Sequence, residues 1–488
     1  MQYIEPNDRH QMQLMGSIDD LVEADNPVRI IDKIVDSIVE SDIERFEKEN
    51  VTEVGRPKYH DSVHIKLYLY GYFNGISSSR RLEVETHRNK EVIWLLGGLR
   101  PDHWTISNYR KEKGEDIKYV TKKFREYLRD AGYIKLKTVA IDGSKIKAYT
   151  NRDMLTIEKI EDKLKGIDKK IEEYLLKIAE TDRRDEVKDE LESNETESGN
   201  KKYIDKIIEL QKQVEELKNK KEILEEENRK YIGASDNDAR LMKSRDGKIP
   251  AYNVQIAVDQ EYKMIADSEV ETEETDLQML PVMIESIKEE LKKVPEEILA
   301  DRGYNSADKI EALEKKEEGI NIYTSQQVTS RDKEEISFKY NEEKDEYICS
   351  AGKRLVLKQR NKLMKKSLTN AYQGIECDGC SLRSQCTKSK KGRIYHRYLN
   401  QKWRDEYKKK MQSKLGKEKT RIRKTIAEHP FGTIKYLMGK IPLKLRGKEK
   451  VSTEINLYTT VYNLKRLFNL ESFGDLFEKI ENYAWETA

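Results

Sequence analysis

The sequence predicts a mixed α/β fold that follows an N-terminal all-α region and carries a coiled-coil hairpin as an insertion. Three observations lead to this fold class. Apolar residues recur at helical spacing near the N-terminus, as in residues 28–39 and 61–73. Two short apolar runs, 138–141 and 297–300, are each followed by an aspartate, and we interpret them as buried strands. Between these runs, residues 157–224 place apolar residues at heptad positions, which is typical of coiled coils.

The composition indicates a polar chain with several domains. Its 488 residues suit about two to four domains. Charged residues make up 38% and hydrophobic residues 36%, so much of the chain must be solvated helix or loop. No run approaches about 18 uncharged apolar residues, which excludes a membrane span, and the first residues show no secretory signal. We therefore expect a cytoplasmic protein whose four cysteines stay reduced.

Residues 1–130 are expected to form a helical domain. Its helices are expected, in chain order, at 28–39, at 61–73, after the serines at 77–79, and from the turn at 101–107 through Tyr109 towards Leu128. Short helices, tight polar turns and basic residues resemble a helix-turn-helix DNA-binding domain. An ordinary helical domain would show the same local pattern, so both interpretations stay open.

Residues 131–153 and 233–324 are expected to form an α/β core. With the insertion left out, the order is strand–strand–strand–helix–strand–helix–strand. The elements are expected at 138–141, 252–259, 264–270, 277–291, 297–300, 308–317 and 320–323. Residues 411–488 add a C-terminal helical part that ends in a long helix over 451–468.

Residues 154–232 are expected to form the coiled-coil hairpin. Apolar residues keep heptad spacing from Ile157 to Ile178 and again from Tyr203 to Leu224. Two such arms joined by a loop bury both apolar stripes without a partner, which favours an intramolecular arm. A coil that dimerises the protein is the alternative.

The charge of the chain is strongly asymmetric, although the formal net charge is only +2. Residues 351–450 contain 30 Lys and Arg against 7 Asp and Glu, a local net of +23, so the rest of the chain sums to −21. A basic block with interleaved aromatic residues favours nucleic-acid binding over a simply solvated surface. We expect residues 325–410 to be an irregular, basic insertion that holds all the cysteines.

Three aspartates at the ends of expected buried strands are candidates for chemistry. A phosphoryl-transfer site with two Mg²⁺ ions needs carboxylates on rigid elements, because hard cations prefer oxygen ligands at set geometry. Asp142, Asp259 and Asp301 meet this condition. Asp259 falls where a hairpin must turn, and Asp is a common turn residue, so a structural role suits it better. Asp142 and Asp301 remain, although acids also cap strands for structural reasons.

A third acid, Glu428, interrupts a strongly basic helical segment. It is the only acid between Glu418 and Glu449, and Lys435 lies about two helical turns beyond it. A carboxylate on a DNA-binding surface weakens binding unless a cation neutralises it, so Glu428 is a candidate metal ligand. A simple charge partner within the helix is the other interpretation.

These stretches together resemble insertion-sequence transposases of the DDE class, which have an RNase H-like catalytic core. The resemblance spans nearly the whole chain. Its motifs are Gly55-Arg-Pro, Pro101-Asp-His-Trp-Thr-Ile-Ser, Val139-Ala-Ile-Asp142-Gly, Asp238-Ala-Arg-Leu-Met, Tyr252-Asn-Val-Gln, Ala300-Asp301-Arg-Gly-Tyr and Glu428-His-Pro-Phe-Gly-Thr-Ile-Lys435. The resemblance implies an RNase H-like catalytic domain behind an N-terminal all-α DNA-binding domain.

The resemblance also implies the site residues. Asp142, Asp301 and Glu428 would form the DDE triad and hold two Mg²⁺ or Mn²⁺ ions. The family signature around the glutamate is Tyr, two residues, Arg, three residues, Glu, six residues, Lys. Glu428 and Lys435 match it, whereas Arg421 and Lys424 replace its Tyr and Arg. The residues expected to contact DNA are Arg423, Lys424, Lys435 and Arg446.

The implied activity is DNA transposition. Water would cleave a strand at the element ends, and the freed 3′-OH would then attack target DNA. The implied partners are double-stranded DNA, as terminal inverted repeats and as target, and further copies of the chain, in a homodimer or larger complex. The resemblance places the protein in the bacterial cytoplasm, at the nucleoid. A nuclease that cuts without joining, and an inactive DNA-binding descendant of a transposase, are the alternatives.

The cysteines have a spacing that suits zinc. Cys349 precedes a cluster in which two residues separate Cys377 from Cys380 and five separate Cys380 from Cys386. Four thiolates can make a tetrahedral zinc site, and a segment poor in apolar residues gains stability from such a site. Reduced structural thiols are the alternative.

Overall fold

A computed structural model describes most of the chain. The residues that it describes are 16–47, 58–150, 153–185, 193–244, 247–317, 319–325, 336–364, 367–437 and 443–485. The Gly55-Arg-Pro motif and the side chain of Lys435 lie outside this description. No helix in these ranges is long and apolar enough to cross a membrane.

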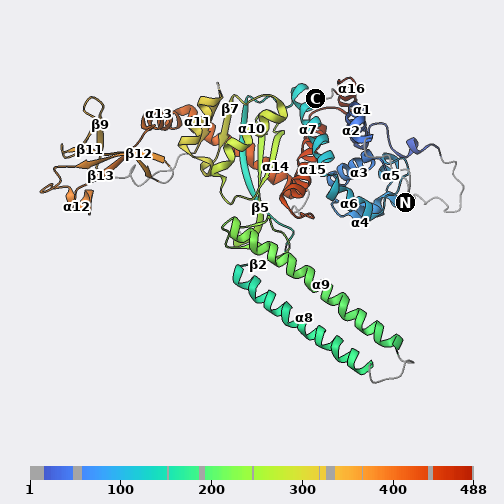
Figure 1. The fold of residues 1–488 in the computed structure, drawn as a ribbon. Helices are drawn as coiled ribbons and strands as arrows, with labels where there is room; N and C mark the ends of the chain where they lie inside the picture. Colours follow the sequence, from blue (N-terminus) through green and yellow to red (C-terminus); the bar gives the residue numbers. More distant parts are fainter. Residues whose placement is uncertain are drawn as a thin grey trace, which may run out of the picture.

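The N-terminal region is helical, as predicted (Figure 1). Asn26 begins the first long helix by accepting a hydrogen bond from the Val28 amide at 2.9 Å. The elements are η1 (Ile18–Leu21), α1 (Pro27–Ser41), α2 (Ile43–Glu47), α3 (Asp61–Phe73), α4 (Ser79–Arg88), α5 (Lys90–Leu95), α6 (His103–Glu112) and α7 (Gly114–Asp130).

The prediction of a single last helix in this region is wrong. The segment from the turn at 101–107 towards Leu128 forms two helices, α6 and α7, which meet at Lys113. A Cβ on Gly114 would lie 2.4 Å from Thr453 Oγ1. The glycine therefore allows the start of α7 to approach a C-terminal helix closely, and the break follows from this tertiary contact.

The α/β core contains every predicted strand and helix in the predicted order, together with one strand, β4, that the prediction missed. Its strands are β1 (Thr138–Lys147), β4 (Arg240–Ser244), β5 (Gly247–Asp259), β6 (Ile265–Glu271), β7 (Glu297–Ala300) and β8 (Asn321–Thr324). They form one sheet in the order β4-β5-β1-β7-β8, and β6 also pairs with β5. β5 is antiparallel to β1, β4 and β6, whereas β7 is parallel to β1 and β8 is parallel to β7. The connections are η3 (Asp276–Gln278), α10 (Met279–Leu291), η4 (Arg302–Tyr304) and α11 (Ala307–Lys316).

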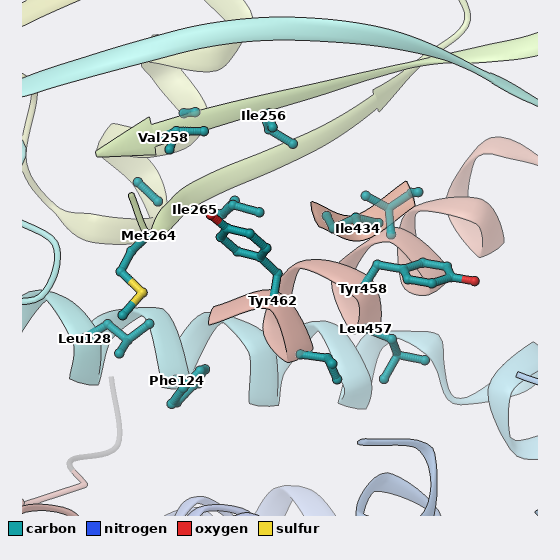
Figure 2. Packing of buried hydrophobic residues seen from close by; sticks show 14 of the residues in the cluster. Phe124, Leu128, Ile256, Val258, Met264, Ile265, Ile434, Leu457, Tyr458 and Tyr462 are labelled. Carbon is teal, nitrogen blue, oxygen red and sulfur yellow. The ribbon is translucent and has the colours of Figure 1, made fainter. Parts of the chain in front are cut away.

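A C-terminal helix, α15 (Lys448–Phe468), joins this sheet to the N-terminal helices. It is buried along most of its length and packs against α3, α7 and β6. Figure 2 shows Tyr462 of α15 near Ile265 of β6, with Phe124 and Leu128 of α7 on the other side. The other C-terminal helices are α13 (Gln401–Gln412), α14 (Lys414–Leu437) and α16 (Phe473–Glu481). A single apolar core runs through all these parts.

Two long helices, α8 (Ile157–Asp185) and α9 (Ser193–Glu226), project from the sheet side by side (Figure 1). They contact one another along their length: Lys221 pairs with Glu161 at 2.7 Å, and the rings of Tyr174 and Tyr203 lie 5.7 Å apart. At their base, β2 (Met154–Leu155) pairs with β3 (Ile232–Gly233). The described part of the pair is thus anchored to the core at its base.

The expectation that residues 325–410 are irregular is wrong. Within the described residues of this segment, β9 (Phe338–Asn341), β10 (Glu346–Cys349), β11 (Arg354–Met364), β12 (Ser367–Gly374) and β13 (Ile394–Tyr398) form an antiparallel sheet, followed in the chain by α13; α12 (Arg383–Cys386) lies between β12 and β13. Tyr347, Leu355 and Tyr372 make its small core. Tyrosines fill this core in place of aliphatic residues, and the basic residues between them hide the alternation that predicts strands.

A buried charge network ties α15 to the N-terminal helices. Glu454 of α15 is fully buried and lies 3.3 Å from Arg110 of α6. Its carboxylate also accepts hydrogen bonds from Tyr72 at 3.2 Å and from the amides of Lys444 and Leu445 at 2.7 and 3.0 Å. One carboxylate thus holds two helices and the loop before α15.

We expect Glu454→Ala to destabilise the protein strongly. The change leaves Arg110 buried without a charge partner, a loss that typically costs about 3–5 kcal/mol. Urea unfolding, followed by circular dichroism, measures the effect. Glu449→Ala, at an exposed position on the same helix, is the matched control and should change the free energy of unfolding by less than about 0.5 kcal/mol. Equal effects of the two variants would contradict the assigned role of Glu454.

Candidate active site

Asp142 and Asp301 lie where the pairing of two parallel strands stops. The expectation that the first strand ends at Asp142 is wrong, because β1 continues to Lys147 through its pairing with β5. β1 and β7 are parallel, and Ile141 is in register with Ala300. Asp142 and Asp301 each follow one of these paired residues, so their side chains begin from neighbouring backbone positions. Both residues are half-buried. The structure therefore brings together two of the three acids that the sequence predicts.

The environment of Asp142 disfavours its charge. Burial raises the pKa of Asp142 from its ordinary value near 3.8 to about 6. The nearby Arg423 guanidinium and the Gly143 amide lower this pKa, whereas the carboxylates of Asp301 and Asp276 raise it. Arg423 Nη1 lies 3.7 Å from Asp142 Oδ1, too far for a direct hydrogen bond. Two cations, Arg423 and the Lys145 that lies 2.9 Å from Asp276, therefore face three carboxylates, which leaves this pocket short of positive charge.

Arg423, on α14, is the cation of this site. It is 9% exposed, and its Nε atom has no hydrogen-bond partner in the part of the chain that the structure describes. Helix α14 packs against β1, β5 and β7, which places Arg423 over the strand ends. A buried guanidinium with an unused donor is suited to a phosphate oxygen.

Asp301 approaches a further acid, Asp276, which the sequence analysis missed. Asp301 Oδ1 accepts a hydrogen bond from the Gly303 amide at 2.6 Å. A Cβ on Gly303 would lie 2.9 Å from Asp301 Oδ1 and 3.3 Å from Asp276 Oδ2. A side chain at this position would crowd both carboxylates, so the glycine leaves room for them. Asp276 precedes a helix and follows no strand, so a search for acids at strand ends does not find it.

Glu428 is not grouped with this pair as a set of metal ligands within the described residues. It is exposed on α14, whereas the buried side of the helix carries Arg423, Ile426 and Ala427. Among the residues that the structure describes, Glu428 forms no hydrogen bond or ion pair. The neighbouring His429 faces α15, with Nδ1 3.0 Å from the Tyr462 hydroxyl. The membership of Glu428 in the site stays a prediction.

The other residues expected to bind DNA are spread over the surface. Lys424 is exposed on α14. Arg446 is exposed too; its Nε donates to the Tyr149 carbonyl at 3.1 Å, and its guanidinium lies 5.3 Å from the centre of the Tyr149 ring. Tyr149 follows β1, so Arg446 lies at the end of the strand that carries Asp142.

The structural role predicted for Asp259 is confirmed. Its carboxylate accepts hydrogen bonds from the amides of Lys135, Leu136 and Glu261, at 3.0, 2.9 and 2.9 Å. These contacts fix the start of β1 and the turn after β5. Asp259 therefore has no free oxygen for chemistry.

The donor set beside Gly303 suits a hard divalent cation, because Asp142, Asp301 and Asp276 contribute carboxylate oxygens and excess negative charge. Even so, no three His, Cys, Asp or Glu side chains within the described ranges are already arranged as ligands. A cation would have to draw these groups closer together.

The four cysteines converge in the second sheet. All are free thiols, and all line one cavity of about 30 Å³. Cys349 ends β10, Cys377 and Cys380 lie in the loop after β12, and Cys386 ends α12. Burial raises the pKa of the Cys386 thiol; Arg393 lowers it, and the other three cysteines raise it further. The four sulfurs thus influence one another, although they too lack ligand geometry.

Comparisons with known proteins identify two regions of the chain. A family model described as a transposase DDE domain matches residues 348–468, and one described as a transposase domain (DUF772) matches residues 16–112. A DDE transposase domain implies an RNase H-like fold. The first match includes Glu428 but neither Asp142 nor Asp301. No curated protein and no solved structure matches the chain.

We expect Asp142→Asn to stabilise the protein at neutral pH when divalent cations are removed. Because the pKa of Asp142 is raised in the folded state, folding stability should fall as the pH rises from about 4 to about 6. Because an amide carries no charge, Asp142→Asn should not show this fall. Its free energy of unfolding should exceed that of the wild type by about 2–3 kcal/mol at pH 7 and should differ little from it at pH 4. Thermal unfolding in EDTA across this pH range measures it. Asp168→Asn, at an exposed position on α8, should follow the wild type; a wild-type profile for Asp142→Asn would contradict the raised pKa.

Proposed function

We propose that the chain, as an insertion-sequence transposase of the DDE class, cleaves DNA strands at the ends of its element and joins the freed 3′-OH to target DNA. The observation that carries this proposal is the placement of Asp142 and Asp301 directly after the last paired residues of two parallel strands, with Arg423 Nη1 3.7 Å from Asp142 Oδ1. Two carboxylates and a guanidinium can hold a metal ion and the phosphate on which it acts.

We assign the catalytic roles as follows. Asp142, Asp301 and Glu428 hold Mg²⁺ or Mn²⁺, which when bound activates a water or a 3′-OH and stabilises the leaving oxygen. Arg423 binds the phosphate beside Asp142, and Lys424, Lys435 and Arg446 bind phosphates along the DNA. The assignment of Glu428 rests on the family signature that it shares with Lys435.

We also propose how the parts divide the work on DNA. The helices within residues 1–130 bind the terminal inverted repeats, and the basic sheet within residues 325–410 binds the DNA backbone. Residues 154–232 form a coiled-coil hairpin that serves as an intramolecular arm. Two or more copies of the chain pair the two element ends in the cytoplasm. The pairing of long helices α8 and α9 supports the arm, and the local net charge of +23 over residues 351–450 supports DNA binding.

One observation favours a second candidate, an inactive DNA-binding descendant. Glu428 is exposed, and within the described residues it is not grouped with Asp142 and Asp301 as a set of metal ligands. An active enzyme would need a bound metal ion to bring the three acids together. The family match does not separate the active enzyme from the inactive descendant, whereas a DNA cleavage assay does.

We expect the protein to cleave DNA that carries the flanks of its own gene, in the presence of Mg²⁺ or Mn²⁺. Asp142→Ala and Asp301→Ala should each reduce the cleavage rate by more than about 100-fold. Loss of a residue that only orients metal ligands typically costs about 10- to 100-fold. Gel analysis of end-labelled DNA measures cleavage, and a supercoiled target plasmid reveals strand transfer. Asp168→Ala on α8 is the matched control.

Glu428→Gln should abolish cleavage while Glu418→Gln, an exposed acid on the same helix, should not. DNA binding by the wild type without any cleavage would instead support the inactive descendant. Cleavage without joining would support a nuclease. Full activity of Asp142→Ala would remove the catalytic assignment altogether.

We propose further that Cys349, Cys377, Cys380 and Cys386 hold a structural Zn²⁺. Their convergence on one cavity supports this, since the only four thiols of the chain come from three separate segments of the second sheet. Within the described residues, the apolar cluster of that sheet has three buried members, so a metal would add stability that a small core lacks.

Mass spectrometry of metals in the purified protein should find one zinc per chain. Cys380→Ser and Cys386→Ser should lose it and should melt at a lower temperature. Ser381→Ala, beside Cys380, is the control and should keep its zinc. If metal-free wild-type protein melts at the same temperature before and after addition of Zn²⁺, the cysteines are plain reduced thiols.

A further inference from the structure

A buried amide, Gln255 of β5, connects the two segments that carry Asp142 and Asp301. Its side chain is fully buried, and its strand position is opposite Gly143, the residue after Asp142. A Cβ on Gly143 would lie 2.4 Å from Gln255 Nε2. The glycine therefore leaves the space next to Asp142 that the glutamine amide occupies.

The amide also reaches the segment of Asp301. The Tyr304 hydroxyl donates a hydrogen bond to Gln255 Oε1. Tyr304 is 1% exposed and ends η4, the short helix whose N-cap is Asp301. One hydrogen bond thus links the β5 strand to the turn that orients the second acid.

The other end of the amide is fixed by Asn253 and Asp276. Gln255 Nε2 donates to Asn253 Oδ1 at 2.8 Å and to Asp276 Oδ1 at 3.0 Å. Asp276 Oδ1 also accepts from Asn253 Nδ2 at 2.8 Å and from Lys145 Nζ at 2.9 Å. Both polar atoms of the Gln255 side chain are therefore used, so the amide has one orientation.

We infer that Gln255 is a positioning residue that sets the separation of Asp142 and Asp301, with Tyr304 and Asp276 holding it in place. This inference rests on the proposed function, because it assigns Gln255 to the proposed metal-binding acids. Gln255 itself does not touch the reacting atoms. A buried network in which each donor has an acceptor is rigid, and two acids on separate chain segments need such a link to keep a fixed spacing.

The test compares Tyr304→Phe with the wild type. Phenylalanine fills the same space but cannot donate to Gln255, and the amide loses its link to η4. Binding of Mn²⁺ to the full chain, measured by electron paramagnetic resonance without DNA, should weaken about 10- to 100-fold, the usual effect of removing a residue that orients metal ligands. The single-turnover cleavage rate should fall by a similar factor, while DNA affinity in EDTA should not change.

Two further variants make the result decisive. Gln255→Leu should behave as Tyr304→Phe does. Tyr323→Phe, on neighbouring β8, is the matched control, because the Tyr323 hydroxyl forms no hydrogen bond within the described chain; it should bind Mn²⁺ as the wild type does. Thermal unfolding shows whether each variant is folded, and if Gln255→Leu is not, Tyr304→Phe decides.

The outcomes separate this inference from the proposed function. If the wild type binds Mn²⁺ and both network variants bind it equally well, Gln255 has no positioning role. If the wild type binds Mn²⁺ but does not cleave, the transposase chemistry fails while the Mn²⁺ comparison still tests Gln255. A wild type that binds no Mn²⁺, either alone or with DNA that carries the flanks of its gene, would overturn both.

Discussion

The burial of α15 is the constraint on which the rest of the structure depends. This helix comes from the C-terminal part of the chain, yet it separates the N-terminal helices from the sheet and packs against both. Arg125 of α7 reaches across this boundary: its guanidinium donates to Ser268 of β6 at 2.7 Å and to Thr459 of α15 at 3.1 Å. Removal of this helix would expose the apolar faces of both the N-terminal helices and the sheet. The N-terminal helices and the sheet are therefore joined through one continuous apolar core on this side.

The same helix protects a vulnerable strand. β6 pairs with β5 on one side only, and an open strand edge invites pairing with other chains. Asn463 of α15 acts as a neighbouring strand would, because it accepts from the Ile265 amide at 2.8 Å and donates to the Ile265 carbonyl at 2.9 Å. The helix that holds the domains together thus also closes the sheet.

Periodicity predicted the elements whose burial follows one local pattern. The first helices and most of the core were accessible in this way, whereas the continuation of β1 past Asp142 to Lys147 was not. Features decided by contacts between distant residues were not. The break at Gly114 depends on Thr453, the second sheet depends on stacked tyrosines, and Asp276 joins the site only because a loop folds back beside Gly303. Sequence spacing carries no signal for these contacts.

The attachment of the α8–α9 pair has an evolutionary consequence. The chain leaves and rejoins the core through β2 and β3, where Met154 lies opposite Gly233. Paired residues in antiparallel strands have Cα atoms only about 5 Å apart, so the two ends of the arm join the core as closely as the ends of a short loop would. Lengthening, shortening or exchanging the arm leaves the register of β1 and β5 unchanged, and with it the position of Asp142. Mutations can therefore change how far the arm extends from the core without moving Asp142.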